Sequence, residues 1–148
     1  MIEVVIEEQA WRLAEPRARS LAKGAAAATL ASERAEKGAG VVILLTADSR
    51  LKALNAAFRG RDAPTNVLSF PGAECASQLG DIALALGVCV REAAEQGKTL
   101  AAHLQHLTAH GVLHLLGYDH QTDVEAEVME AKERLILAGL GVADPYAS

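Results

Sequence analysis

Apolar residues follow two patterns along this chain. Short segments that alternate between apolar and polar residues, or are apolar throughout, are typical of strands, whereas apolar residues three or four apart are typical of helices that face a core. The strand pattern occurs at residues 2–7, 41–45, 66–70 and 79–84. Stretches with helical spacing separate most of these segments, so we predict about four strands interleaved with helices.

The helical stretches have recognisable ends. An Ala-rich run over residues 17–37 follows Pro16, which suits a first helical turn, and precedes Gly38. Asp48 is predicted to cap a short helix that Gly60 ends. A third helix should end at Gly97, and a fourth should run from a Thr99 cap to Leu116.

A fifth helix is predicted near the C-terminus. Thr122 and Glu125 form a capping box at its start, and Gly139 closes it. Its predicted apolar stripe consists of Val124, Val128, Ala131 and Leu135. The whole pattern predicts one α+β domain over residues 1–148, with a mixed sheet of about four strands flanked by about five helices.

Composition fits a soluble globular protein. Of the 148 residues, 51% are hydrophobic and 22% are charged. No apolar run approaches the roughly 20 residues that span a bilayer. The first eight residues are too acidic for a signal peptide, so we expect a cytoplasmic protein without a membrane partner. Cys75 and Cys89 form no C-x-x-C motif and are expected to be reduced thiols.

Charge is unevenly distributed. Residues 119–148 carry seven acids and two bases, which gives −5 and equals the net charge of the whole chain. Within the balanced remainder, residues 50–62 hold four bases and one acid, the bases being Arg50, Lys52, Arg59 and Arg61. This segment is either a local basic patch for nucleic acid or an ordinary solvated helix face.

Three histidines carry the strongest chemical signal. His110, His114 and His120 have the spacing His-x3-His-x5-His, with Gly117 between the last two. Residues four apart lie on one face of a helix, and the glycine can end that helix and turn the chain back. Three imidazoles with a fourth coordination position left open are typical of a catalytic zinc site.

The same helix carries His103 and His106. Residues 106 and 114 are eight apart, or about 12 Å along a straight helix, which is too far for both to bind one ion with His110. We therefore expect His103 and His106 to be polar residues packed near the site, groups behind the ligands, or groups that face RNA.

A similar spacing occurs in metzincin peptidases, whose motif has a Glu directly after the first His as general base. Gly111 occupies that position here and cannot accept a proton. A peptidase or other zinc hydrolase would need a base from elsewhere. Asp119 is the carboxylate nearest to the third ligand in sequence; it either orients an imidazole, helps to activate water, or is an ordinary turn residue.

Four sequence blocks resemble the YbeY family of bacterial rRNA maturation endoribonucleases. They are the histidine segment 110–120, residues 55–71 (Asn-Ala-Ala-Phe-Arg-Gly-Arg-Asp-Ala-Pro-Thr-Asn-Val-Leu-Ser-Phe-Pro), residues 79–82 and residues 144–146. The resemblance runs from about residue 40 to the C-terminus and is weaker before it. The family often has Asp where this chain has Asn66, which argues against an acid–base role for that position.

The resemblance implies a zinc-dependent single-strand endoribonuclease that acts in 16S rRNA 3′-end maturation and ribosome quality control. It implies one Zn²⁺ per chain on His110, His114 and His120. It also implies a catalytic Arg59 that holds the phosphate, with Arg61 as the other guanidinium near the site. Thr65 and Ser69 would line the groove. Single-stranded rRNA and the small ribosomal subunit with its proteins are the expected partners, and DNA is not.

A second hypothesis is a non-catalytic ribosome assembly factor in which zinc only stabilises the fold. The missing general base, the acidic C-terminal segment and the few aromatic residues for base stacking favour it. A metallopeptidase is the third and weakest hypothesis, because Gly111 stands where the motif needs its base.

Overall fold

The computed structural model describes residues 2–35, 39–59, 66–71 and 78–146. Four strands and six helices lie within these residues. The strands are β1 (Ile2–Ile6), β2 (Gly40–Thr46), β3 (Val67–Pro71) and β4 (Gln78–Ala85). The helices are α1 (Ala10–Ala14), α2 (Ala18–Ser32), α3 (Asp48–Arg59), α4 (Leu86–Glu95), α5 (Leu100–Leu115) and α6 (Asp123–Gly139).

The strands form one mixed sheet in the order β1-β2-β4-β3. β1 pairs with β2 and β2 with β4 in parallel, whereas β3 pairs with β4 antiparallel. β3 and β4 are adjacent in sequence, so they can pair antiparallel without a helical crossover. This pairing puts β3 beside β4 at the edge of the sheet. The predicted α+β fold with a four-stranded mixed sheet is confirmed.

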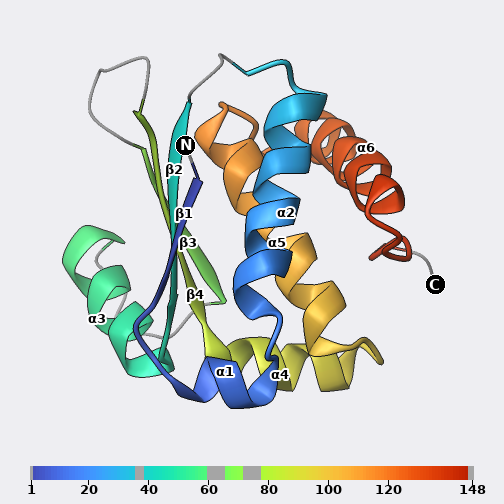
Figure 1. Ribbon diagram of the computed structural model, residues 1–148. Coiled ribbons are helices and arrows are strands. Elements are labelled where there is room, and N and C mark those ends of the chain that lie inside the picture. Colours follow the sequence, from blue (N-terminus) through green and yellow to red (C-terminus); the bar gives the residue numbers. More distant parts are fainter. Residues whose placement is uncertain (1, 36–38, 60–65, 72–77, 147–148) are drawn as a thin grey trace.

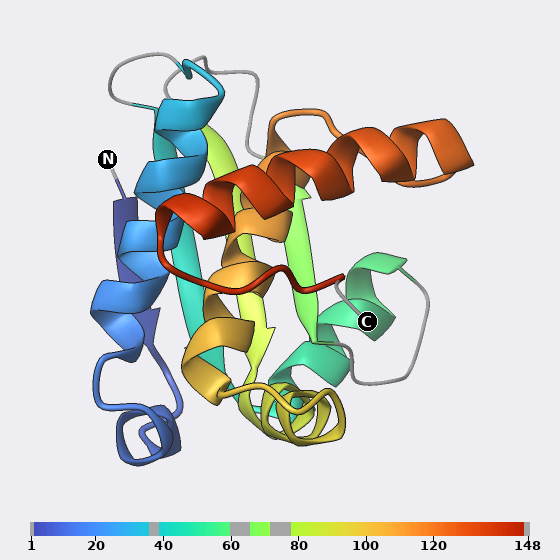
Figure 2. The same cartoon turned by 90° about the vertical axis from the view of Figure 1, so that its right-hand side faces the viewer.

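Helices cover the two faces of the sheet unequally. α2 and α5 pack against one face and α6 lies across them, whereas α3 is the helix of the described residues that lies on the other face (Figure 1). The core between the sheet and α5 contains Ile43 and Ile82 from the strands and Leu104 and Val112 from the helix. Small residues on α2 let it pack closely beside α5 (Figure 2). They are Ala18, Ala22, Ala25 and Ala26.

Helix α1 was not predicted from the sequence. It has five residues, too few to show a helical period, and it is held in place by one side chain. Trp11 is fully buried, and its indole Nε1 donates a hydrogen bond to the carbonyl oxygen of Thr46 at 3.0 Å. A tertiary contact therefore stabilises this helix, which local propensity alone would not.

Helix α2 ends at Ser32 rather than at residue 37. Arg34 has φ of 51°, in the left-handed region, and the N–H of Ala35 bonds to the carbonyl of Leu30. This bond across the helix end closes the last turn. The next residue, Glu33, is held outside the helix by tertiary contacts, because its carboxylate accepts hydrogen bonds from Tyr118 and from Lys132 on α6.

The predicted apolar stripe of α6 is wrong. All four of its residues are exposed, with Val124 at 71% and Leu135 at 75%. The buried face instead consists of Met129, Glu133, Ile136 and Leu137. A single charged residue interrupts this face, so the periodicity of apolar residues pointed to the wrong side of the helix.

Two predicted helix caps are confirmed and one is wrong. The hydroxyl oxygens of Thr99 and Thr122 accept from the N–H groups of Ala102 and Glu125. Asp48, by contrast, is the first residue of α3, and its carboxylate accepts from the N–H of Val88 in the first turn of α4. Asp48 therefore ties two helices together.

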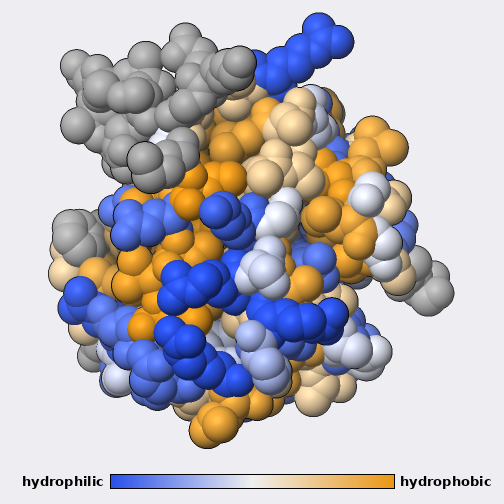
Figure 3. All heavy atoms as spheres, in the orientation of Figure 1, coloured by the Kyte–Doolittle hydropathy of each residue, from blue (hydrophilic) through white to orange (hydrophobic). Residues whose placement is uncertain are grey.

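The outer face of the sheet is only partly covered by α3. An apolar groove of about 350 Å³ remains beside this helix, and Figure 3 shows apolar atoms gathered on this side of the molecule. Its lining includes Val42, Leu44, Leu54, Phe70 and Ala83.

Among the described helices, none combines the length and the hydropathy that a bilayer crossing requires. Cys89 is a buried free thiol, and Cys75 lies outside the described residues.

Candidate metal centre

Helix α5 and the turn after it bring the three histidines together. α5 is firmly placed, because Leu104, Leu107 and Val112 are buried against the sheet and α2. The chain turns back at Gly117, whose φ of 103° is in the left-handed region that a side chain would disfavour. The third histidine of the motif follows three residues later, beside the end of the helix.

The predicted cluster is present in the structure. His110, His114 and His120 each offer a ring nitrogen, and these three atoms lie within 4.8 Å of one another. The Nε2 atoms of His110 and His114 are 3.1 Å apart. Among the described residues, this is the one group of three or more such side chains close enough to share an ion, so His106 is not part of it.

The cluster fits a zinc ion. Bonds of 2.0–2.1 Å in a tetrahedral arrangement place two ligand nitrogens about 3.3 Å apart, close to the separation of the His110 and His114 nitrogens. Burial lowers the pKa of His114, and the neighbouring His110 and His120 lower it further. The neutral imidazole is the form that binds a metal. His120 is exposed, so one side of the cluster faces solvent.

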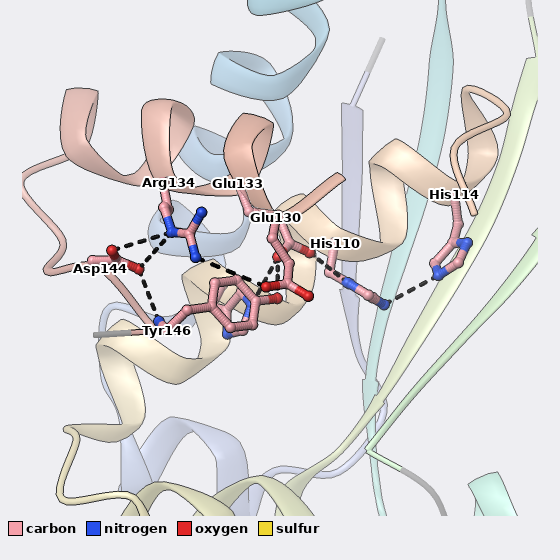
Figure 4. Close-up of polar contacts among 8 residues, drawn as sticks. His110, His114, Glu130, Glu133, Arg134, Asp144 and Tyr146 are labelled. Atoms are coloured by element: carbon pink, nitrogen blue, oxygen red, sulfur yellow. Dashed lines mark hydrogen bonds and ion pairs between the residues drawn. The ribbon is translucent and has the colours of Figure 1, made fainter. Parts of the chain in front are cut away.

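Glu133 supports the cluster from behind, a role that the sequence did not reveal. Its side chain is fully buried in the middle of α6, and its Oε1 lies 2.5 Å from Nδ1 of His110 (Figure 4). A histidine that donates its Nδ1–H to a carboxylate presents Nε2 as the free ligand atom. Glu133 therefore fixes the direction in which His110 points Nε2.

The protonation state of Glu133 is set by its neighbours. Burial alone would raise its pKa, but hydrogen bonds from His106, His110 and Tyr146 lower the pKa to about 2. The carboxylate is therefore ionised although it is shielded from water. A signal for it was present in the sequence: Glu133 lies four residues from both Met129 and Leu137, which places an acid on the buried face of α6.

Gly111 occupies a packed position, which explains why no general base follows the first histidine. A Cβ at residue 111 would lie 3.1 Å from two side-chain carbons of Ile82 on β4. The position faces the sheet, where a glutamate would be buried in the apolar core. Because α5 approaches β4 so closely, a side chain at residue 111 would fit only if the Ile82 side chain shifted.

The other predicted site residues are placed as follows. The carboxylate of Asp119 accepts from the backbone N–H of His120 at 2.8 Å, a turn contact. The hydroxyl of Ser69 donates to the carbonyl of Gly111 at 3.3 Å and ties β3 to α5. Arg59 is the last residue of α3, and only its backbone is described. Arg61 and Thr65 lie outside the described residues.

His103 and His106 lie close to the cluster without joining it. His103 is 2% exposed, and its Nε2 lies 2.9 Å from Oε1 of Glu92, which also accepts from Asn66. His106 contacts Glu133 at 3.4 Å, behind His110. The prediction that both are polar residues packed near the site agrees with these positions.

Fold and site together define a class of protein. An α+β domain that presents three clustered imidazoles on an open-sided surface, with a buried carboxylate behind one of them, is typical of metal-dependent hydrolases. Comparison with known sequences gives the family. A profile described as endoribonuclease YbeY matches residues 3–141, and the chain belongs to this family. The expected class of enzyme, a metal-dependent endoribonuclease with zinc as cofactor, is confirmed by this membership and the histidine cluster.

Curated relatives cover nearly the whole chain. A protein named endoribonuclease YbeY from Azorhizobium caulinodans is 49% identical over 99% of this chain and 96% of its own length. A second, from Maricaulis maris, is 50% identical over 98% of this chain and 91% of its own length. The solution structure of TM1509 from Thermotoga maritima has a TM-score of 0.60 at 25% identity and covers both chains completely.

Proposed function

We propose that this protein is a zinc-dependent endoribonuclease that cleaves single-stranded rRNA during 16S rRNA 3′-end maturation and ribosome quality control. The observation that carries the proposal is the open-sided cluster of His110, His114 and His120 in a chain of this family. The small ribosomal subunit and its proteins are the proposed partners, and the cytoplasm is the proposed location.

The protein's own residues prepare the site. Zinc, when bound, supplies a Lewis acid for a phosphoryl oxygen and lowers the pKa of a water molecule towards 7. His114 is kept neutral by burial, and His110 is oriented by Glu133, so both are ready to act as ligands without rearrangement. His120 closes the triad from the exposed turn.

Two pockets adjoin the cluster and offer a path for RNA. The larger, of about 350 Å³, is lined on its polar side by Asn66, Glu92 and Lys98. The smaller, of about 240 Å³, includes His120 and Met129. His110 lies in the walls of both pockets, so a strand that runs from one pocket to the other would pass the cluster. We place the nucleotides on either side of the cleaved bond in these two pockets.

Arg59 is proposed as the catalytic cation. A guanidinium offers a fork of donors that matches phosphate oxygens and stabilises the charge that builds on them. Arg59 is the last residue of α3, and this helix contacts β3, the strand that carries Ser69. Arg61, Thr65, Ser69 and Asp119 remain proposed as supporting or substrate-binding groups.

The test is cleavage of a defined fragment from the 3′ end of 16S rRNA. His114→Ala and Arg59→Ala should each lower the rate by about 10²–10³-fold, the scale of losing a group that stabilises transition-state charge. Arg12→Ala removes an exposed arginine on α1 and serves as the charge-matched control. Full activity of either site variant, in preparations free of other nucleases, would contradict the proposal.

A non-catalytic assembly factor is the second candidate. The observation that favours it is the outer face of α6, where acidic residues accompany the exposed Val124, Val128 and Leu135. Such a surface suits a basic protein better than RNA. Complementation of cells that lack the enzyme distinguishes the two functions. Restoration of normal rRNA ends by the His114→Ala protein would favour the assembly role.

A further inference from the structure

The chain that follows α6 returns across the helices that carry the metal centre. Gly141 has φ of 77°, and the N–H of Val142 bonds to the carbonyl of Leu137, which turns the chain sharply at the helix end. The returning segment then crosses α5 (Figure 2). It brings Tyr146 next to His106 and Glu133, although these residues are far apart in the sequence.

Several contacts hold Tyr146 in this place. Its backbone N–H donates to Oδ1 of Asp144 at 2.8 Å, and Asp144 in turn pairs with Nε of Arg134 at 3.2 Å. The guanidinium of Arg134 lies 5.3 Å from the centre of the Tyr146 ring. On another side, the ring of His106 meets the Tyr146 ring edge-on, with centroids 5.5 Å apart. The phenol ring is therefore positioned before any ligand binds.

The hydroxyl of Tyr146 completes the hydrogen bonding of Glu133. It donates to Oε2 of that carboxylate, which also lies 3.4 Å from Nε2 of His106 (Figure 4). The other oxygen, Oε1, is left for Nδ1 of His110. The two carboxylate oxygens thus have different partners. Together these partners fix the rotation of the Glu133 carboxylate.

We propose that Tyr146 is a positioning residue for the metal centre: its hydroxyl fixes the rotation of the Glu133 carboxylate, which holds the ligand nitrogen of His110 towards zinc. The inference rests on the zinc site of the proposed function. The last torsion of a glutamate has broad, shallow preferences, so hydrogen-bond partners decide the plane of the carboxylate. Without the tyrosine hydroxyl, Oε2 of the buried Glu133 carboxylate loses a donor, and the carboxylate turns to recover one.

The test is the zinc affinity of Tyr146→Phe, measured by competition with a chromophoric chelator. This variant keeps the ring, its packing on His106 and its contact with Arg134. Loss of a group that holds a ligand from behind typically weakens metal binding 10–100-fold, and Tyr146 acts through one further residue. We expect a loss of about tenfold, with a changed visible spectrum of the cobalt-substituted protein. Unchanged affinity and spectrum would overturn the inference.

A double-mutant cycle separates positioning from general stability. If Tyr146 acts through Glu133, the Phe substitution should change zinc affinity little in a Glu133→Gln background. An equal loss in both backgrounds would overturn the inference. Glu127→Gln, an exposed change on the same helix, is the control and should bind zinc like the wild type.

RNA cleavage is measured on the same preparations. A wild-type protein that binds zinc but cleaves no RNA, and whose affinity falls in Tyr146→Phe, would support the positioning role while refuting the proposed function. Conversely, an active Tyr146→Phe protein with unchanged zinc affinity would refute the positioning role alone.

Discussion

Two tyrosine–glutamate pairs contact helix α6 or include one of its residues, and a comparison of the two pairs explains how the metal centre is supported. In one pair the hydroxyl of Tyr146 donates to Glu133, and in the other the hydroxyl of Tyr118 donates to Glu33 at 2.5 Å. Both pairs adjoin a proposed ligand. Glu133 holds His110 directly, and Tyr118 lies in the turn that leads to the third histidine.

The two carboxylates differ in the charge of their partners. Glu33 accepts from the ammonium group of Lys132 at 3.2 Å, and this lysine also lies 5.2 Å from the centre of the Tyr118 ring. Within the described residues, the ion pairs of Glu133 involve histidines alone. Beside the cluster, hydrogen bonds from Tyr146 and two histidine rings therefore stabilise the carboxylate in place of a lysine. Away from the cluster, a lysine can do so.

Of the substitutions that test this comparison, Glu133→Gln should have the largest effect, and the quantity affected is zinc affinity. The change keeps the shape of the side chain but removes the negative charge that polarises His110, so zinc affinity should fall about 10–100-fold. Chelator competition measures it, with Glu127→Gln as the exposed control on the same helix. Zinc affinity equal to that of the wild type would show that the buried carboxylate has no part in metal binding.

Tyr118→Phe should act mainly on stability. The substitution removes a hydrogen bond between the turn and α2, which should lower the free energy of unfolding by about 1 kcal/mol. Zinc affinity should fall less than in Tyr146→Phe, because Tyr118 contacts none of the three ligand rings through its hydroxyl. Urea unfolding and chelator competition on both variants give the comparison. A larger loss of zinc affinity in Tyr118→Phe than in Tyr146→Phe would show that the Tyr118–Glu33 pair matters more for metal binding.

The Glu33 pair should also depend on pH. Burial alone would raise the pKa of Glu33, but hydrogen bonds from Tyr118 and Lys132 outweigh it and keep the pKa below its ordinary value of 4.5. A carboxylate with a depressed pKa contributes its stability fully above the unfolded-state pKa and loses it as the pH falls through the folded-state value. The stability difference between wild type and Tyr118→Phe should therefore shrink as the pH falls below the ordinary carboxyl pKa of 4.5. Unfolding midpoints across pH 3–7 test this, and a constant difference would contradict it.

Lys132→Met should have the smallest effect. The lysine side chain is 32% exposed, and ion pairs near the surface contribute little because water screens them. We expect a loss of about 0.5 kcal/mol or less in unfolding free energy and normal zinc affinity. A large loss of zinc affinity in this variant would mean that the Glu33 pair, like the Glu133 pair, governs the ligands.

Much of this protein follows from local patterns. The four strands occur close to where alternation and apolar runs placed them, and the helix that carries the histidines begins at its predicted Thr99 cap. Helix α1 and the end of α2 were not predictable in this way. The first depends on the burial of Trp11 and the second on partners of Glu33 that lie 85 and 99 residues away.

The sequence by itself determined the three-histidine cluster that we propose binds the metal. His110 and His114 are one helical turn apart and Gly117 turns the chain, so short-range geometry is enough to bring three imidazoles together. Only the tertiary structure decided what supports them. Glu133 looked like one acid among many in a surface helix, because the face that α6 buries depends on its packing against α5 rather than on its own periodicity. Likewise, Gly111 looked like a lost catalytic base, and packing shows that the position faces Ile82.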